Sequence, residues 1–86
     1  MPNHVYVAMY QAAIQPRYYI IDVFSNEESA RDCIKRYAEE HCEKDKLHEW
    51  TESPCEIIVK AYDICNGEKW LYGVDYFRVI KKEIKE

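Results

Sequence analysis

Zinc-binding residue types lie close together in the middle of the sequence. They are two histidines and two cysteines: His41, Cys42, His48 and Cys55. Structural zinc sites usually supply their ligands as closely spaced pairs, such as two cysteines separated by a few residues. No such pair occurs in this stretch. His41 and Cys42 are adjacent, so their side chains diverge by about 100° on a helix. The spacing argues against a metal site, and we expect neither a metal nor another cofactor.

The thiols and carboxylates do not form a recognisable catalytic pattern. A cysteine nucleophile needs a neighbouring base and a lowered pKa. Cys33 instead falls on the apolar face of a predicted helix, where burial raises the pKa of a thiol. Glycine occurs only at positions 67 and 73, which excludes a glycine-rich phosphate loop. We therefore expect a protein that is not an enzyme.

A second interpretation stays open at this stage. A helix packed on a sheet can enclose a pocket, and Cys33, His41 and Cys65 would lie near such a boundary. The alternative function is accordingly a small-molecule- or metal-binding domain with a site between helix and sheet.

The composition indicates a globular protein. The chain of 86 residues is long enough for one domain, residues 1–86, and its 48% hydrophobic and 33% charged content is not that of a disordered segment. The net charge is −4, and the one basic cluster, at residues 78–85, is diluted by acidic residues. Nucleic-acid binding is disfavoured, because phosphate neutralisation requires a basic surface.

The sequence also indicates a compartment. The N-terminus lacks the basic start and apolar stretch of a signal peptide, and no apolar run approaches the roughly 20 residues that span a bilayer. We expect a cytoplasmic protein without a membrane partner. The four cysteines are then expected to be reduced thiols, since disulfides are rare in that compartment.

Hydrophobic periodicity predicts the order of elements. Residues 4–14 and 18–24 alternate as strands, with apolar side chains on both faces of the first. Residues 26–46 are predicted to form a helix, opened by a capping box of Ser25 and Glu28. Its buried stripe contains Ala30, Cys33, Ile34, Tyr37, Ala38 and His41.

The second half contains a predicted hairpin. Strands at 55–65 and 68–73 flank Asn66-Gly67, a pair that favours a two-residue turn, and this register places Tyr62 opposite Leu71 and Asp63 opposite Trp70. Residues 47–54 read as a connector. Residues 75–86 fit a strand or a helix, and the strand is favoured because a helix would leave Val79 in solvent.

These elements predict an α+β fold. We expect an antiparallel sheet of four or five strands with one main helix packed on one face, in the order β-β-α-β-β with the C-terminal segment as strand or helix.

The aromatic residues suggest a surface for a partner. The chain has eight tyrosines and two tryptophans, residue types that are enriched in protein interfaces, and a core of this size cannot enclose them all. We expect most of them on the sheet face away from the helix. The predicted partner-binding residues are Tyr6, Tyr10, Tyr18, Trp50, Tyr62, Trp70 and Tyr72. Trp50 lies in the polar connector, where it either folds back onto the core or contacts a partner.

The helix contributes a charged surface. Glu39, Glu40 and Glu43 lie on its solvent side and would steer the chain toward a basic partner. Self-association through the sheet is a further possibility, because the same uncovered face is available to a second copy.

The first half resembles small uncharacterised proteins that are common in bacteriophage and mobile-element genomes. The resemblance covers residues 4–38 and is carried by "HVYVAMY" and "YYIIDVFSNEESARDCIKRY". It implies a phage-type accessory protein, a class that contains many non-enzymatic inhibitors of host or antiviral-defence proteins, such as anti-CRISPR proteins. We therefore expect a protein-binding module of that kind, whose partner is another protein.

Overall fold

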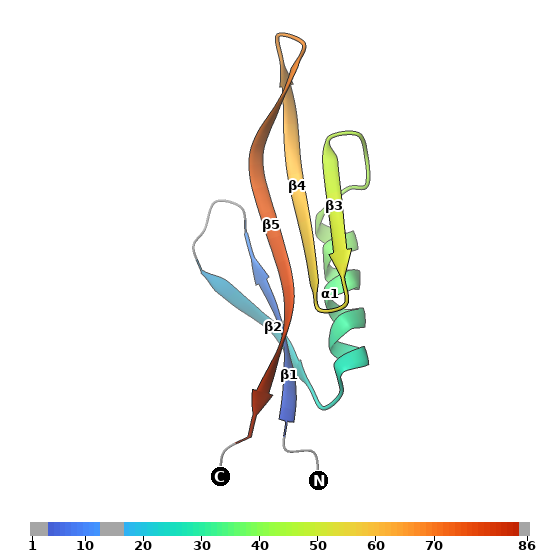
Figure 1. Ribbon diagram of the computed structural model, residues 1–86, viewed down its shortest axis with the longest axis vertical. Helices are drawn as coiled ribbons and strands as arrows, with labels where there is room; N and C mark the ends of the chain where they lie inside the picture. Colours follow the sequence, from blue (N-terminus) through green and yellow to red (C-terminus); the bar gives the residue numbers. More distant parts are fainter. Residues whose placement is uncertain (1–3, 13–16, 85–86) are drawn as a thin grey trace.

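One antiparallel sheet of five strands carries a helix on one side (Figure 1). The computed structural model describes residues 4–12 and 17–84. Its elements are β1 (His4–Gln11), β2 (Tyr18–Phe24), α1 (Glu27–His41), β3 (His48–Ser53), β4 (Glu56–Cys65) and β5 (Glu68–Glu83). The strands lie in the order β2-β1-β5-β4-β3, so β5 is central. The α+β class and an antiparallel sheet with one helix are confirmed.

The core lies between α1 and the sheet. Its buried residues are Ala8, Ala30, Ile34, Ala38, Cys42, Ile57, Val59, Phe77 and Val79. The three alanines allow the helix backbone to approach the strands closely, because they carry only a methyl group. Phe77, on the central strand, is fully buried, and its ring stacks on that of Tyr10 with centroids 4.9 Å apart.

Asn26, and not the predicted Ser25, caps the start of α1. The Asn26 side chain accepts a hydrogen bond of 2.8 Å from the backbone N–H of Ser29, three residues later in the sequence. Glu27 and Glu28 occupy the first turn, where carboxylates favour the positive end of the helix dipole. The capping-box spacing of Ser25 and Glu28 therefore predicted the cap one residue too early.

The cap at Asn26 can be tested by comparing two neighbouring alanine variants. We expect Asn26→Ala to lower the free energy of unfolding by about 1 kcal/mol, because the Ser29 amide loses its acceptor. Ser25→Ala, one residue earlier, should change it by less than about 0.5 kcal/mol. Urea unfolding of the two variants checks this, and an equal loss in both would contradict the assignment.

The helix is shorter than predicted and ends at His41 instead of residue 46. Cys42 adopts an extended conformation (φ −128°, ψ 134°) while its N–H still donates to the carbonyl of Ala38. This change of direction buries Cys42 and leaves His41 exposed, which corrects the expected end of the buried stripe. The Asp45 carboxylate then accepts the Leu47 N–H at 2.8 Å and turns the chain toward the sheet.

The predicted connector contains an edge strand. Residues 48–53 form β3, which pairs with β4 from His48 opposite Ala61 to Ser53 opposite Glu56. The C-terminal segment is also strand, as favoured, and it continues the fourth predicted strand without interruption as β5. The first strand ends at Gln11. Residues 13 and 14, which the sequence assigned to it, lie outside the described residues.

Candidate protein-binding site

The β4–β5 hairpin extends beyond the other strands (Figure 1). β3 pairs with β4 only as far as Ala61, and β1 pairs with β5 only from Tyr76 onward. Residues 62–72, which we call the hairpin arm, therefore form a two-stranded ribbon. Its tip is Asn66-Gly67 with φ values of 51° and 79°, the left-handed conformation that a tight hairpin turn requires. The predicted turn and register are confirmed.

A β-bulge marks the base of the arm. Ala61 pairs with Gly73 and Tyr62 with Leu71, so Tyr72 is an extra residue on β5. A bulge increases the local twist and redirects side chains. Beyond the bulge, the alternation of side chains between the two faces of β5 is shifted relative to the rest of the sheet. Tyr72, the extra residue, projects into solvent.

Large apolar side chains on the arm are exposed to solvent. The exposed fractions are 60% for Ile64, 57% for Trp70, 52% for Leu71 and 66% for Tyr72. An isolated two-stranded hairpin is marginally stable in water. Apolar side chains that stay exposed to solvent do not stabilise it further, so their exposure on the arm is not explained by folding. Pairing in the arm places Ile64 and Leu71 on one face of the ribbon and Trp70 on the other, so both faces expose apolar side chains. Exposed apolar residues of this kind are typical of a surface that a partner covers.

Contacts at the base hold the arm in place. The Tyr62 hydroxyl donates a hydrogen bond of 2.9 Å to Glu49 on β3, which raises the pKa of Tyr62. The Lys69 ammonium lies 4.3 Å from the centre of the Tyr62 ring. The Tyr62 N–H also donates to the carbonyl of Leu47 at 2.7 Å. Tyr62 thus anchors the arm, while Trp70 and Tyr72 remain available.

The acidic residues predicted to steer a partner lie toward the same end of the molecule. Glu39 and Glu40 are exposed near the end of α1, and Glu43 is exposed in the following loop. That loop leads into His48, which pairs with Ala61 at the base of the arm. An apolar arm with carboxylates at its base would complement an apolar groove bordered by basic residues.

The predicted aromatic stripe on the face opposite α1 is not formed, and two of its members lie on the helix side. Tyr6 and Tyr10 are half-buried and pack against the core. The Tyr10 ring contacts Tyr37, at a centroid distance of 5.4 Å, and its hydroxyl donates to Asp75. The alternation along β1 identified two faces, but it did not indicate that the small side chain of Ala8 marks the face under the helix.

Trp50 folds back onto the protein. It is half-buried, packs against the core, and its indole N–H donates a hydrogen bond of 3.1 Å to the carbonyl of Glu43. The Lys44 ammonium lies 4.8 Å from the ring centre. Of the two alternatives for Trp50, the structure shows the contact with its own chain.

Tyr18 lies on β2, away from the arm, beside Arg78 of β5. The guanidinium of Arg78 donates to the Tyr18 hydroxyl and pairs with Glu56. It also lies 5.1 Å from the Tyr76 ring. Of the predicted binding residues, the structure therefore brings together Tyr62, Trp70 and Tyr72. It adds Ile64 and Leu71, which the aromatic search missed although both are apolar residues in the predicted hairpin.

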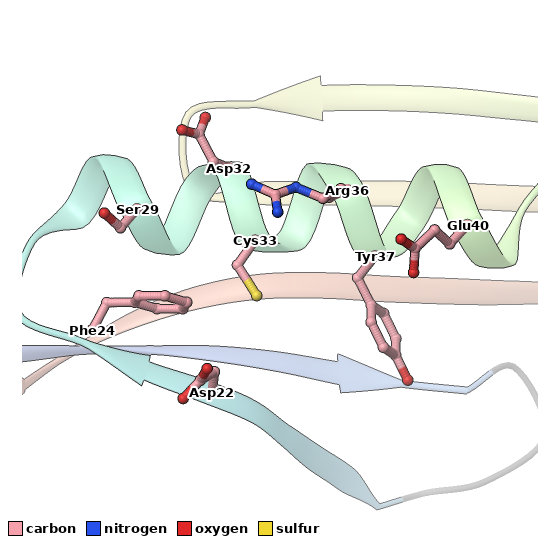
Figure 2. A pocket seen from close by; sticks show the side chains of 8 residues that line it. All are labelled: Asp22, Phe24, Ser29, Asp32, Cys33, Arg36, Tyr37 and Glu40. Atoms are coloured by element: carbon pink, nitrogen blue, oxygen red, sulfur yellow. The ribbon is translucent and has the colours of Figure 1, made fainter.

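A groove of about 440 Å³ separates α1 from β2 (Figure 2). It is lined by Asp22, Phe24, Ser29, Asp32, Cys33, Arg36, Tyr37 and Glu40. The Cys33 thiol points from the helix toward the sheet, between Phe24 and Tyr37. Burial and the Asp22 carboxylate raise the pKa of Cys33, while Arg36 lowers it, and the net change is upward. A raised pKa favours the protonated thiol over the reactive thiolate.

The alternative site around Cys33, His41 and Cys65 is not assembled. Cys65 is exposed beside the turn of the arm, whereas Cys33 lines the groove. His41 stacks on Tyr37 with ring centroids 4.0 Å apart. Within residues 4–12 and 17–84, no three histidine, cysteine or acidic side chains lie close enough to hold a metal ion. All four cysteines are free thiols.

A second thiol is held protonated beneath the end of α1. The Cys42 thiol donates to Asp75 at 3.6 Å, and the Tyr10 hydroxyl donates to the other oxygen of that carboxylate at 3.3 Å. Burial and the Asp75 carboxylate raise the pKa of Cys42 from 9.0 to about 12. The same causes raise the pKa of Tyr10 from 10.0 to about 12.

These raised pKa values predict alkaline destabilisation. Between pH 9 and 12 the unfolded chain loses the Cys42 proton more readily than the folded chain does, so the free energy of unfolding falls as the pH rises. The slope from one proton is at most about 1.4 kcal/mol per pH unit. We expect Cys42→Ala to show a shallower decline than the wild-type chain in urea titrations from pH 8 to 10. Identical slopes would contradict the raised thiol pKa.

Comparisons with known proteins give no relative for this chain: no protein-family model, curated protein or solved structure matches it. In the described part of the chain, no helix has the length and apolar character needed to cross a bilayer. The candidate site consequently stands on its own geometry.

Proposed function

We propose that this chain is a non-enzymatic protein-binding module that holds another protein with its hairpin arm. The observation that supports this most directly is the exposure of Ile64, Trp70, Leu71 and Tyr72 on a ribbon that extends beyond the sheet. Tryptophan and tyrosine are the residues that most often dominate the binding energy of an interface. Because Tyr62 fixes the base of the arm, less conformational entropy is lost on binding.

The partner on this proposal has an apolar groove with basic residues at its edge. The arm enters the groove, and Glu39, Glu40 and Glu43 face the basic edge. Charges at the margin of an interface accelerate encounter more than they strengthen the complex. The aromatic residues therefore determine the affinity, and the carboxylates determine the association rate and its dependence on salt.

The biological setting we propose is that of a cytoplasmic phage-type accessory protein which inhibits a host or antiviral-defence protein, in the manner of anti-CRISPR proteins. The support is the resemblance over residues 4–38 to small phage and mobile-element proteins. The four free thiols are compatible with a reducing compartment. An arm that occupies a groove on another protein is also a direct way to block that groove.

The test is capture of the partner from a bacterial lysate by the wild-type chain and by a Trp70→Ala/Tyr72→Ala variant. The inhibitory role has its own readout, which is phage plating on strains that carry one defined defence system each. The proposal is supported if phage form plaques on a defended strain that expresses the wild-type chain and not on one that expresses the variant. Plating restored equally by both would move the inhibitory surface away from the arm.

A further inference from the structure

The sheet face opposite α1, which we call the open face, is apolar although no element of the described chain covers it. In an antiparallel sheet with one covered face, the other face is normally polar. Here the residues that alternate with the buried ones are Val5, Val7, Met9, Ile20, Val23, Ile58, Val74, Tyr76 and Ile80. The sequence of β1 already showed apolar side chains on both faces, which is typical of a strand covered on both sides.

Cross-strand pairing joins most of these residues into one surface. Val7 lies between Val23 on β2 and Ile80 on β5, and Tyr76 on β5 lies beside Ile58 on β4. Ile20 and Val23 on the edge strand β2 are 65% and 48% exposed. The apolar surface therefore extends from β2 across β1 to Ile80 on the central strand, and the Arg78–Glu56 ion pair lies between it and the apolar pair of Tyr76 and Ile58.

We propose that a second copy of this chain covers the open face and forms a two-fold symmetric dimer. The inference is independent of the proposed function, because it concerns the five-stranded part of the sheet and not the hairpin arm.

Charge favours a second copy at this face. The open face carries three basic side chains, Lys60, Arg78 and Lys82, and two acidic ones, Glu49 and Glu56. Arg78 and Glu56 form an ion pair within the chain. The face is thus nearly neutral, while the whole chain has a net charge of −4. Two copies can approach through this face with little repulsion, and their acidic surfaces then point away from each other.

The size of the face matches a dimer interface. Outside the hairpin arm the five strands contain 38 residues, His4–Gln11, Tyr18–Phe24, His48–Ser53, 56–61 and 73–83. At about 3.3 Å along each strand and about 4.8 Å between strands, they give a projected area of roughly 600 Å². A standard protein interface buries about 800 Å² of accessible surface on each partner. The accessible area of a face covered with side chains exceeds its projected area, so the open face supplies an interface of this size.

The distribution of residues also fits a two-fold axis that crosses the strands. The open-face side chains of β2 and β1 are mostly apolar, those of β5 include Arg78 and Lys82 beside Val74, Tyr76 and Ile80, and those of β3 and β4 are mostly polar. About this axis each strand lies on its own copy, running in the opposite direction, so the apolar residues of β2 and β1 meet the same residues of the second copy. The two hairpin arms then extend from opposite ends of the dimer, and both remain free.

The test compares two variants that add the same charge at different places. Ile20→Lys/Val23→Lys changes the open face, and Ile64→Lys/Leu71→Lys changes the hairpin arm. All four positions are at least 48% exposed, so folding should be little affected, and circular dichroism checks this. Each variant replaces two apolar residues with lysine and changes the net charge per chain equally. Sedimentation equilibrium over about 1–100 µM measures the dimer dissociation constant.

We expect the wild-type chain to approach twice its monomer mass of 10.4 kDa across this range. The open-face variant should dimerise at least about 100-fold more weakly, because each interface would bury charged ammonium groups. The arm variant should stay within about threefold of the wild-type value.

Two results would overturn the proposal. One is a wild-type chain that stays at 10.4 kDa at every concentration. The other is an arm variant that dissociates as much as the open-face variant. If the double open-face variant does not fold, Ile20→Lys alone replaces it at the more exposed position, with Ile64→Lys as its control. Because the arm variant should lose partner capture while it stays dimeric, failure of this inference and failure of the proposed function are distinguishable.

Discussion

Replacing Trp70 and Tyr72 with alanine is expected to weaken partner binding at least about 100-fold while the chain stays folded. Central aromatic residues in an interface typically contribute 2 kcal/mol or more each, and about 1.4 kcal/mol corresponds to a tenfold change in affinity. Both side chains are more than half exposed and contribute little to the core. A titration of the purified partner with each variant measures the dissociation constants.

The control for this prediction is Tyr19→Ala. Tyr19 is 49% exposed and lies on β2, where it pairs with Tyr10 on the helix side of the sheet. The substitution removes an exposed aromatic ring at a position outside both the arm and the open face. It should leave the affinity within about threefold of the wild-type value. If the control weakens binding as much as the arm variant does, the arm is not the binding surface.

Phe77→Ala is expected to have the largest effect on stability, a loss of about 3–5 kcal/mol in the free energy of unfolding. Phe77 is fully buried on the central strand, and its ring contacts both Tyr10 and Tyr37. Truncation leaves a cavity that the helix and the two tyrosines cannot fill without moving. For a chain of 86 residues this loss is a large share of the total stability.

Leu71→Ala is the matched control on the same strand. Leu71 is 52% exposed on the arm, so its truncation should cost less than about 1 kcal/mol. Urea unfolding monitored by circular dichroism measures both variants. Similar losses for Phe77→Ala and Leu71→Ala would contradict the location of the core.

The parts of the fold with strong local signals were predictable. The Asn66-Gly67 turn fixed its own register because both residues tolerate positive φ, and the structure has that register. The apolar stripe of α1 was also recognised, with Ala30, Ile34 and Ala38 buried. The end of the helix was not recognised, because residues 42–46 have ordinary helix propensity and it is the pairing of β3 with β4 that redirects the chain.

The edge strand β3 left no clear signal in the sequence. Its residues, "HEWTES", alternate between two faces, but only Trp50 is a large apolar side chain. A polar edge strand protects a sheet from unwanted pairing, and the same polarity makes it resemble a loop.

The candidate site was predictable in composition and not in shape. The sequence identified Trp70 and Tyr72 as surplus aromatic residues, but it could not show that β1 and β3 stop short of the hairpin tip. That difference in strand length is what leaves the arm without a covering layer. Tyr6 and Tyr10 were assigned to the wrong face of β1, because an alternating strand defines two faces without identifying which of them a helix will cover.

The claim that the arm holds the partner is tested most directly by amide hydrogen exchange on the isolated complex. Exchange is compared between the free chain and the chain bound to the captured protein. We predict that the strongest new protection falls on residues 62–72, with smaller changes at the acidic end of α1. Unchanged exchange in the arm, with new protection confined to β2 or to the groove beside Cys33, would contradict the proposed binding surface.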